Sequence, residues 1–168
     1  GEAAGFISAP VHSSVSGTVI AIEDRPHASR GTCLAVVVES DGKNEIHESI
    51  KPNKSLDELT PDEIIEIVKN AGIVGMGGAA FPTSVKAQLS EDLGSIDTLI
   101  INACECEPYI TADAMLLQMY PQQVLRGAMI LADVLDPLYI VVAVEDNKKE
   151  AIQSLKQALK DYPQIHLE

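Results

Sequence analysis

Two short apolar segments stand out in the first fifty residues of the chain. The segment 17–23 alternates with β-branched side chains, which is typical of a strand, and 34–39 is a valine-rich run that predicts a second one. The pair Asp41-Gly42 is a hairpin signal and predicts a turn into a returning strand. The three predicted strands are 17–23, 34–39 and 44–47, with turn residues at 24–27 and Gly31 between the first two.

From residue 61 onward the pattern changes to amphipathic helices and short, continuously apolar strands. Thr60-Pro61-Asp62-Glu63 combines an N-cap threonine, a proline at the first helical position and a glutamate at the third, which predicts a helix that ends near Gly72. Further helices are predicted at 83–89, 111–118 and 121–135 and after a capping Asn147; strands are predicted at 97–102 and 138–144 and from Gln164.

Continuous apolar strands separated by amphipathic helices predict a parallel sheet that helices cover on both faces. We therefore expect an α/β fold with a Rossmann-like parallel sheet, incomplete at residue 168, preceded by a small β unit. The expected division is a partial β domain over 1–50, a polar linker over 51–60, and an α/β domain over 61–168.

Composition excludes several classes of function. The chain carries 12 basic and 25 acidic residues, a net charge of −13, which argues against nucleic-acid binding and against attachment to anionic lipid by charge alone. No apolar run approaches the roughly 20 residues that span a bilayer. Three cysteines do not suggest a disulfide framework, so a reducing cytoplasm is expected.

A glycine-rich segment is the first candidate for chemistry. Gly72, Gly75, Gly77 and Gly78 precede a short helix that carries Lys86. Backbone amides without a neighbouring Cβ can converge on an anion, and the lysine can add a full positive charge. The segment matches neither the P-loop nor the dinucleotide-binding fingerprint, because the lysine is misplaced and a helix precedes the glycines. A flexible turn between two helices is the alternative.

An acidic segment comes directly after the first buried strand. Asn102, Glu105 and Glu107 lie where ligands of open α/β sheets bind, just beyond the carboxyl end of the strand, and they can accept hydrogen bonds from ribose hydroxyls or ring N–H groups. The alternative is that the glutamates cap the next helix or face solvent. The spacing of Cys104 and Cys106 does not match a zinc or redox motif, so we expect no metal site there.

These two segments carry a resemblance. Gly-Ile-Val-Gly-Met-Gly-Gly-Ala-Ala-Phe-Pro-Thr-Ser-Val-Lys at 72–86 and Ile-Asp-Thr-Leu-Ile-Ile-Asn-Ala-Cys-Glu-Cys-Glu-Pro-Tyr-Ile-Thr-Ala-Asp at 96–113 resemble the C subunit of the Rnf electron transport complex. The stretch 144–148 is similar to the next segment of that family, and 9–19 is similar to its barrel-sandwich, lipoyl-like domain. The likeness covers nearly the whole chain.

The resemblance implies a function and its cofactors. The family is related to the flavin-carrying, NADH-binding subunit of respiratory complex I, which implies an FMN site and electron transfer between NAD(H) and ferredoxin, coupled to an ion gradient. Its iron–sulfur clusters need cysteine motifs that this sequence lacks, so we expect a piece of a larger subunit that is inactive alone and binds FMN weakly or not at all. The implied partners are membrane-bound and ferredoxin-like subunits, with a peripheral position on the cytoplasmic face of the membrane.

The resemblance also implies roles for particular residues. The FMN phosphate would bind to the glycine loop and to Lys86. The flavin and its ribityl chain would contact Asn102 and Glu105. Glu107 would lie toward the nicotinamide nucleotide, and Phe81 would stack near the adenine. The implied cofactor-binding residues are Gly75, Gly77, Gly78, Lys86, Asn102, Glu105, Glu107 and Phe81. No residue is expected to transfer protons. Complex I has arginine at the position of Met76, so part of the phosphate-binding charge is absent here.

Two other functions fit the same sequence. One is a non-catalytic scaffold or carrier, in which a lipoyl-like module and a Rossmann-like domain dock partner subunits. The other is a flavin-dependent cobalamin-reductase relative, which would use the same flavin site with another electron acceptor. Cysteine-rich cluster motifs in the complete reading frame would favour electron transfer, and their absence would favour the scaffold.

Overall fold

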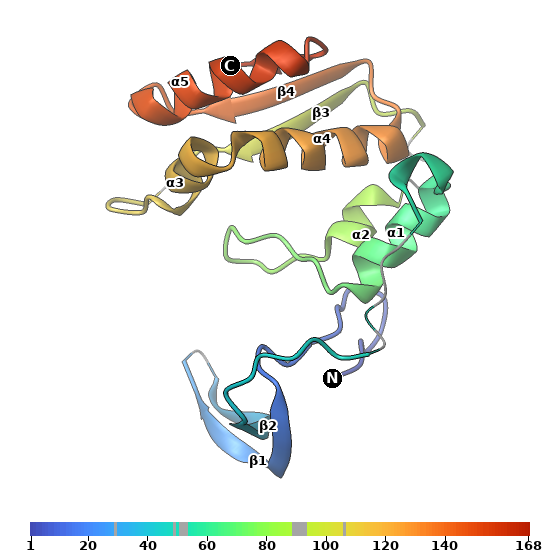
Figure 1. Ribbon diagram of the computed structural model, residues 1–168, viewed down its shortest axis with the longest axis vertical. Helices are drawn as coiled ribbons and strands as arrows, with labels where there is room; N and C mark the ends of the chain where they lie inside the picture. The colour runs from blue at the N-terminus through green and yellow to red at the C-terminus, as the bar shows by residue number, and fades with distance from the viewer. Residues whose placement is uncertain (29, 49, 51–53, 89–93, 106) are drawn as a thin grey trace.

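The computed structural model describes residues 1–28, 30–48, 50, 54–88, 94–105 and 107–168. Figure 1 shows a β-hairpin at one end of the molecule, a small sheet with its helices at the other, and α1 and α2 between them. The elements are β1 (Gly17–His27), β2 (Gly31–Ser40), η1 (Leu56–Glu58), α1 (Pro61–Asn70), α2 (Thr83–Ala87), β3 (Thr98–Ala103), α3 (Ala112–Met119), α4 (Pro121–Leu135), β4 (Tyr139–Val144), α5 (Lys149–Ala158), η3 (Leu159–Asp161) and β5 (Ile165–Leu167).

The N-terminal β unit is one long antiparallel pair, β1 with β2, which bends at an irregularity between Val19 and Ala21. The predicted turn at 24–27 is wrong: these residues belong to β1, and the chain reverses between His27 and Gly31. Proline fits in this strand because, in the two-stranded pair, one edge of β1 has no strand partner. The predicted strand at 44–47 is also wrong, because that segment is loop.

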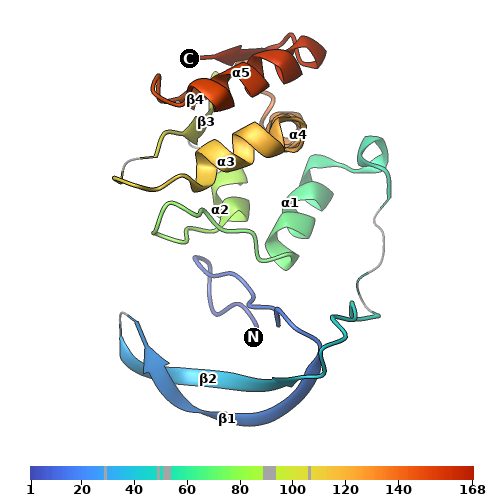
Figure 2. The same cartoon turned by 60° about the vertical axis from the view of Figure 1, so that its left-hand side comes forward.

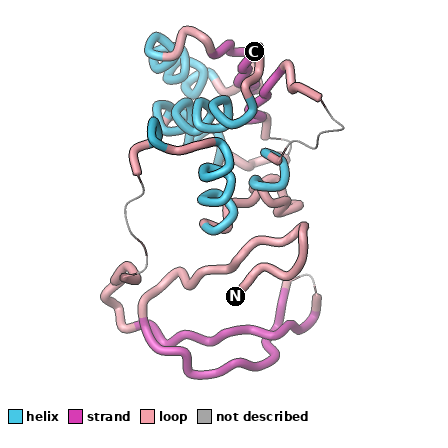
Figure 3. Tube along the Cα trace, turned by 90° about the vertical axis from the view of Figure 1, so that its right-hand side faces the viewer, coloured by secondary structure: helices cyan, strands magenta, loops and turns pink. Residues whose placement is uncertain are grey.

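Asp41 forms a turn at the end of β2, but this turn does not lead into the predicted third strand. Asp41 accepts hydrogen bonds from the Ser16 hydroxyl at 2.6 Å and from the Lys43 amide at 2.9 Å, so it turns the chain away from β2 instead of leading into a third strand. Figure 3 shows that the N-terminal segment is loop and runs between the hairpin and the helices.

The start of α1 confirms the predicted capping chemistry. The Thr60 hydroxyl accepts the Glu63 amide at 3.3 Å, and the Glu63 carboxylate accepts the Thr60 amide at 2.9 Å. After α1, Gly72 takes a φ of +69°. A Cβ there would lie 2.5 Å from the carbonyl oxygen of Pro10, so glycine also lets the N-terminal segment pack against the end of α1.

Strands β3, β4 and β5 form the predicted parallel sheet, in that order. The inward positions of the strands pack against α3, α4 and α5 in one apolar core. The fully buried members are Leu117, Leu125, Val142 and Leu155. The strand predicted from Gln164 is confirmed by β5.

The prediction that helices cover both faces of this sheet is wrong. Helices α3, α4 and α5 contribute to the same core, and on the other face Ile100 and Tyr139 are 60% and 57% exposed. The strand order explains the difference: successive parallel strands are added in one direction, and right-handed crossovers in one direction place their helices on the same face. A sheet covered on both faces needs a reversal of that order.

The predicted cap of α5 is wrong by one residue. The N-cap position is Lys148, without a side-chain capping bond, and α5 begins at Lys149. The Lys148 side chain instead reaches back to Glu105, at the end of another strand.

Candidate functional site

The glycine-rich segment forms a closed loop between α1 and α2. An antiparallel bridge joins Val74 to Pro82, and the Gly75 amide donates to the Phe81 carbonyl at 2.8 Å. The Thr83 amide donates to the Ile73 carbonyl at 3.0 Å, which extends the pairing on the other side of the bridge. The base of the loop is therefore fixed by backbone bonds.

The tip of this loop is exposed and has room for a ligand. A Cβ added at Gly77 or Gly78 would meet no atom within 4 Å. Gly78 has a φ of +99° and Ala80 a φ of +50°, so the tip turns through conformations that side chains disfavour. Gly77 and Gly78 thus face open space, as an anion-binding turn requires, whereas the amide of Gly75 already donates to the Phe81 carbonyl and is not free to bind an anion.

Lys86 lies directly beside the loop, as the sequence predicts. A Cβ at Gly75 would be 3.1 Å from the Lys86 ammonium nitrogen, which also lies 5.9 Å from the centre of the Phe81 ring. The structure therefore brings Gly75, Phe81 and Lys86 together, within one loop and the short helix that follows it.

The acidic segment lies after β3, and its three predicted residues have different surroundings. The Asn102 side chain is exposed and accepts the Cys104 amide at 3.1 Å. Glu107 is exposed, whereas Glu105 is 8% exposed and points inward. Cys106 lies outside the described residues.

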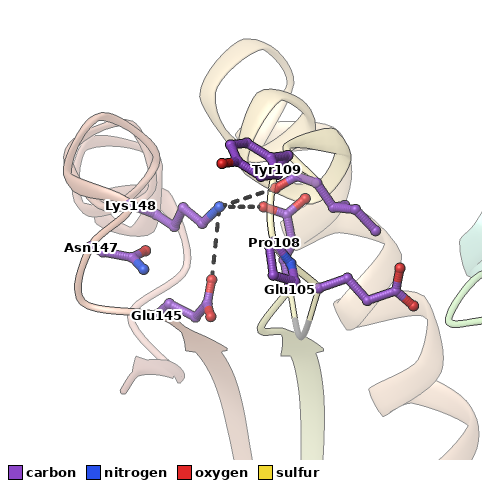
Figure 4. A pocket seen from close by; sticks show the side chains of 8 residues that line it. Glu105, Pro108, Tyr109, Glu145, Asn147 and Lys148 are labelled. Atoms are coloured by element: carbon purple, nitrogen blue, oxygen red, sulfur yellow. Dashed lines mark hydrogen bonds and ion pairs between the residues drawn. The ribbon is translucent and has the colours of Figure 1, made fainter.

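The carboxylate of Glu105 is held from two sides. One oxygen accepts the Asp113 amide in the first turn of α3 at 2.8 Å, and the other accepts the Lys148 ammonium at 2.7 Å. Figure 4 shows that Lys148 also faces the carboxylate of Glu145, at 3.8 Å, and the carbonyl of Ile110, at 3.4 Å. The two segments that come after β3 and β4 are thereby joined.

These contacts shift the ionisation of both partners in the direction that keeps them charged. The hydrogen bond from Lys148 lowers the pKa of Glu105, burial opposes this shift, and the Asp113 amide adds to the lowering. The hydrogen bond to Glu105 raises the pKa of Lys148. The pair is therefore ionised at neutral pH.

The paired side chains border a cavity of about 270 Å³ at the carboxyl edge of the sheet. Carboxylates, one ammonium and an exposed aromatic ring line it, so it can accept hydrogen bonds from hydroxyl and amide groups. The lining residues are Glu105, Glu107, Pro108, Tyr109, Ile110, Glu145, Asn147 and Lys148.

Of the eight lining residues, only Glu105 and Glu107 were predicted site residues; Tyr109, Glu145 and Lys148 are among the six that sequence reasoning missed. Tyr109 is fully exposed with a φ of +67°, a rare conformation for a bulky side chain. The topology could have located Glu145 and Lys148, because β4 pairs with β3 in parallel. The carboxyl ends of both strands therefore meet at one edge of the sheet, where these two residues follow β4.

The glycine loop and the acidic segment project from the same side of the molecule. In Figures 1 and 2 the loop between α1 and α2 and the loop before α3 extend in the same direction, with α2 beside them. A ligand that reaches both would lie across this side.

A known family model covers both the glycine loop and the acidic segment. The sequence model of the Nuo51 FMN-binding domain matches residues 68–168, which include the glycine loop, Lys86 and the acidic segment. The chain belongs to the Nuo51 FMN-binding domain family. The sequence model of the RnfC barrel sandwich hybrid domain matches residues 1–43, which include both strands of the hairpin.

Curated relatives of this Nuo51-family chain are subunits of ion-translocating complexes. It is 46% identical, over 95% of its length, to the C subunit of the Na(+)-translocating ferredoxin:NAD(+) oxidoreductase complex of Acetobacterium woodii. It is 41% identical, over 93% of its length, to the C subunit of the ion-translocating oxidoreductase complex of Vibrio cholerae. The chain spans 36% of the first relative and 20% of the second. The predicted resemblance to the Rnf C subunit is confirmed.

Solved structures support the fold. A crystal structure of an NAD+-reducing [NiFe]-hydrogenase in the H2-reduced state superposes with a TM-score of 0.57 over 71% of this chain and 23% of that chain, at 22% identity. The air-oxidized state gives a TM-score of 0.52 over 67% of this chain. Within the described residues, no helix is both long enough and apolar enough to cross a membrane.

Proposed function

We propose that this chain forms the nucleotide-binding end of an electron-transfer subunit, in which FMN mediates between NAD(H) and further redox centres. The observation that carries the proposal is the position of the Lys86 ammonium beside a glycine loop whose tip is unobstructed, in a chain of the FMN-binding family. The phosphate of FMN would bind at Gly77, Gly78 and Lys86.

The residues fit the chemistry of FMN. A phosphate needs backbone N–H groups and a cation, and the loop tip has space where side chains would otherwise stand. The polar edge of a flavin and its ribityl hydroxyls need acceptors, and Asn102 and Glu107 are exposed, at the end of β3 and in the segment after it. Phe81 is half-buried beside Lys86 and offers a ring face to the adenine of NAD(H).

When bound, FMN supplies the exchange of a hydride with nicotinamide and the release of single electrons. The chain's own residues bind and orient. Lys86 neutralises phosphate charge, and Asn102 orients ribityl or ring N–H groups. Glu105, held inward by Lys148, fixes the loop that presents Glu107 to the nicotinamide nucleotide. None of these residues is required to transfer a proton.

The remaining parts of the proposal concern the full-length protein. Residues 1–50 would act as a barrel-sandwich unit and 61–168 as part of the FMN/NADH-binding domain, joined by the linker 51–60. Iron–sulfur clusters would be held by other parts of the protein, and the partners would be ferredoxin-like and membrane-bound subunits. The names of the relatives support assembly with other subunits of an ion-translocating oxidoreductase complex. The subunit would lie peripherally, at the cytoplasmic face of the membrane.

Titration of the full-length apo-subunit with FMN, followed by the quenching of flavin fluorescence, tests the proposal. Lys86→Ala removes one charge-assisted hydrogen bond of about 1.5–3 kcal/mol, so FMN affinity should fall roughly 10- to 150-fold. Lys69→Ala, on the exposed surface of α1, is the matched control and should leave affinity unchanged. Equal affinity of both variants, or no binding by the wild type, would contradict the proposal.

A further inference from the structure

The best-anchored polar group at the carboxyl edge of the sheet is the ion pair of Glu105 and Lys148. The Glu105 side chain is 3% exposed and the Lys148 side chain 19%, whereas the ion pairs within the described residues that do not include Lys148 join side chains that are 43–61% exposed. A carboxylate this deeply buried needs a partner, because removal of the partner leaves an uncompensated charge away from water.

The pair joins two elements that are distant in the sequence. Glu105 lies two residues after β3, and Lys148 stands at the N-cap of α5, 43 residues later. The second carboxylate oxygen of Glu105 accepts the Asp113 amide at 2.8 Å, so the pair also fixes the start of α3. Lys148 and Glu105 therefore connect the end of β3, the start of α3 and the turn into α5.

The segment between Glu105 and Asp113 carries most of the exposed lining residues of the cavity. Glu107 and Tyr109 lie on this segment, and Lys148 also reaches the Ile110 carbonyl at 3.4 Å. Tyr109 is fully exposed at a φ of +67°, a conformation that persists only where its surroundings hold the backbone. The shape of the cavity thus depends on where Lys148 holds the loop.

We propose that Lys148 is a positioning residue of the nucleotide site: through Glu105 it fixes the loop 107–111, and so the place of Glu107 and Tyr109 against the nicotinamide nucleotide. The proposal rests on the proposed function for the identity of that nucleotide. Lys148 acts through another residue, so its loss should weaken nucleotide binding more than it slows the later electron-transfer step.

The test uses the full-length subunit in its complex, loaded with FMN, with NADH as the electron donor and an artificial dye as the acceptor. Lys148→Met should raise the KM for NADH at least tenfold and change kcat less than threefold. Lys148→Arg should restore most of the affinity, because the guanidinium can keep the ion pair. Lys149→Met, the same change at the next and exposed position, is the matched control and should behave as the wild type.

A double variant separates this role from a general loss of charge. Glu105→Gln leaves no buried carboxylate to neutralise, so Lys148→Met combined with Glu105→Gln should have a KM no higher than Lys148→Met alone. The proposal is overturned if the two effects multiply, if arginine is no better than methionine, or if Lys148→Met raises the KM no more than Lys149→Met.

Hydrogen–deuterium exchange gives a second readout that needs no nucleotide. Amides of 107–113 should exchange at least tenfold faster in Lys148→Met than in Lys149→Met, and equal exchange would overturn the positioning role. If the wild type shows no NADH-dependent reduction of FMN, the proposed function fails, while the exchange comparison still decides the role of Lys148.

Discussion

Replacing Gly77 by alanine should separate flavin binding from folding. Gly77 lies at the exposed tip of the glycine loop, and a Cβ added there would meet no protein atom within 4 Å. It is not among the glycines with a positive φ. The substitution therefore adds a methyl group only where the phosphate of FMN is proposed to bind.

The structure predicts a small change in the free energy of unfolding and a larger change in FMN affinity. The free energy of unfolding should change by less than about 0.5 kcal/mol, because an open surface position has no contact to lose. Binding should change more, since a Cβ keeps the phosphate from the loop amides, and each charge-assisted hydrogen bond contributes about 1.5–3 kcal/mol. The dissociation constant for FMN should therefore rise by roughly 10- to 150-fold.

Both quantities can be measured on the full-length subunit, by urea unfolding and by flavin fluorescence titration. Gly127→Ala is the matched control: Gly127 lies within α4, a Cβ there is also unobstructed, and the change should stabilise the helix by about 0.5–1 kcal/mol without altering FMN affinity. Unchanged FMN affinity in Gly77→Ala would refute the reasoning, because the loop would then be only a turn between helices.

Three further predictions concern the fold and its pH dependence. Gly72→Ala should lower the free energy of unfolding by at least about 1–2 kcal/mol in urea, because its φ is +69° and a Cβ would lie 2.5 Å from the Pro10 carbonyl oxygen; an unchanged midpoint would contradict the docking of the N-terminal segment. Leu155→Ala should cost about 2–5 kcal/mol, because its side chain is fully buried, whereas Leu138→Ala, at a 79% exposed position, should cost less than about 0.5 kcal/mol; equal losses would contradict the core. The pKa of Glu105 is lowered in the folded protein, so its stabilisation is complete above its unfolded pKa and is lost as the pH falls through the folded value. Glu105→Gln should therefore lower the melting temperature at pH 7, and the difference from the wild type should shrink in acid; a constant difference from pH 7 to pH 3 would contradict the ion pair.

Local chemistry made parts of the fold predictable. The capping residues of α1 act within four positions, so the sequence alone locates the start of that helix. The apolar runs of β3 and β4 have no alternation, which indicates the parallel sheet that the structure contains. Gly75, Phe81 and Lys86 come together because a short loop and one helical turn connect them; their role in binding stays a prediction.

Longer-range features were not predictable from the same patterns. The strand order β3-β4-β5 determines that helices lie on one face, and hydrophobic periodicity carries no information about order. The turn residues in 24–27 have the composition of a loop, but strand pairing outweighs that preference in a two-stranded hairpin. Lys148 was missed because its partner Glu105 lies 43 positions away in the sequence and is reached only through the topology.

The most direct measurement is the structure of the full-length subunit with FMN bound. The proposal predicts the FMN phosphate within hydrogen-bonding distance of the Gly77 and Gly78 amides and of the Lys86 ammonium, with the flavin ring directed toward the segment after β3. A flavin bound elsewhere, or a phosphate held by other residues while this loop stays empty, would contradict it.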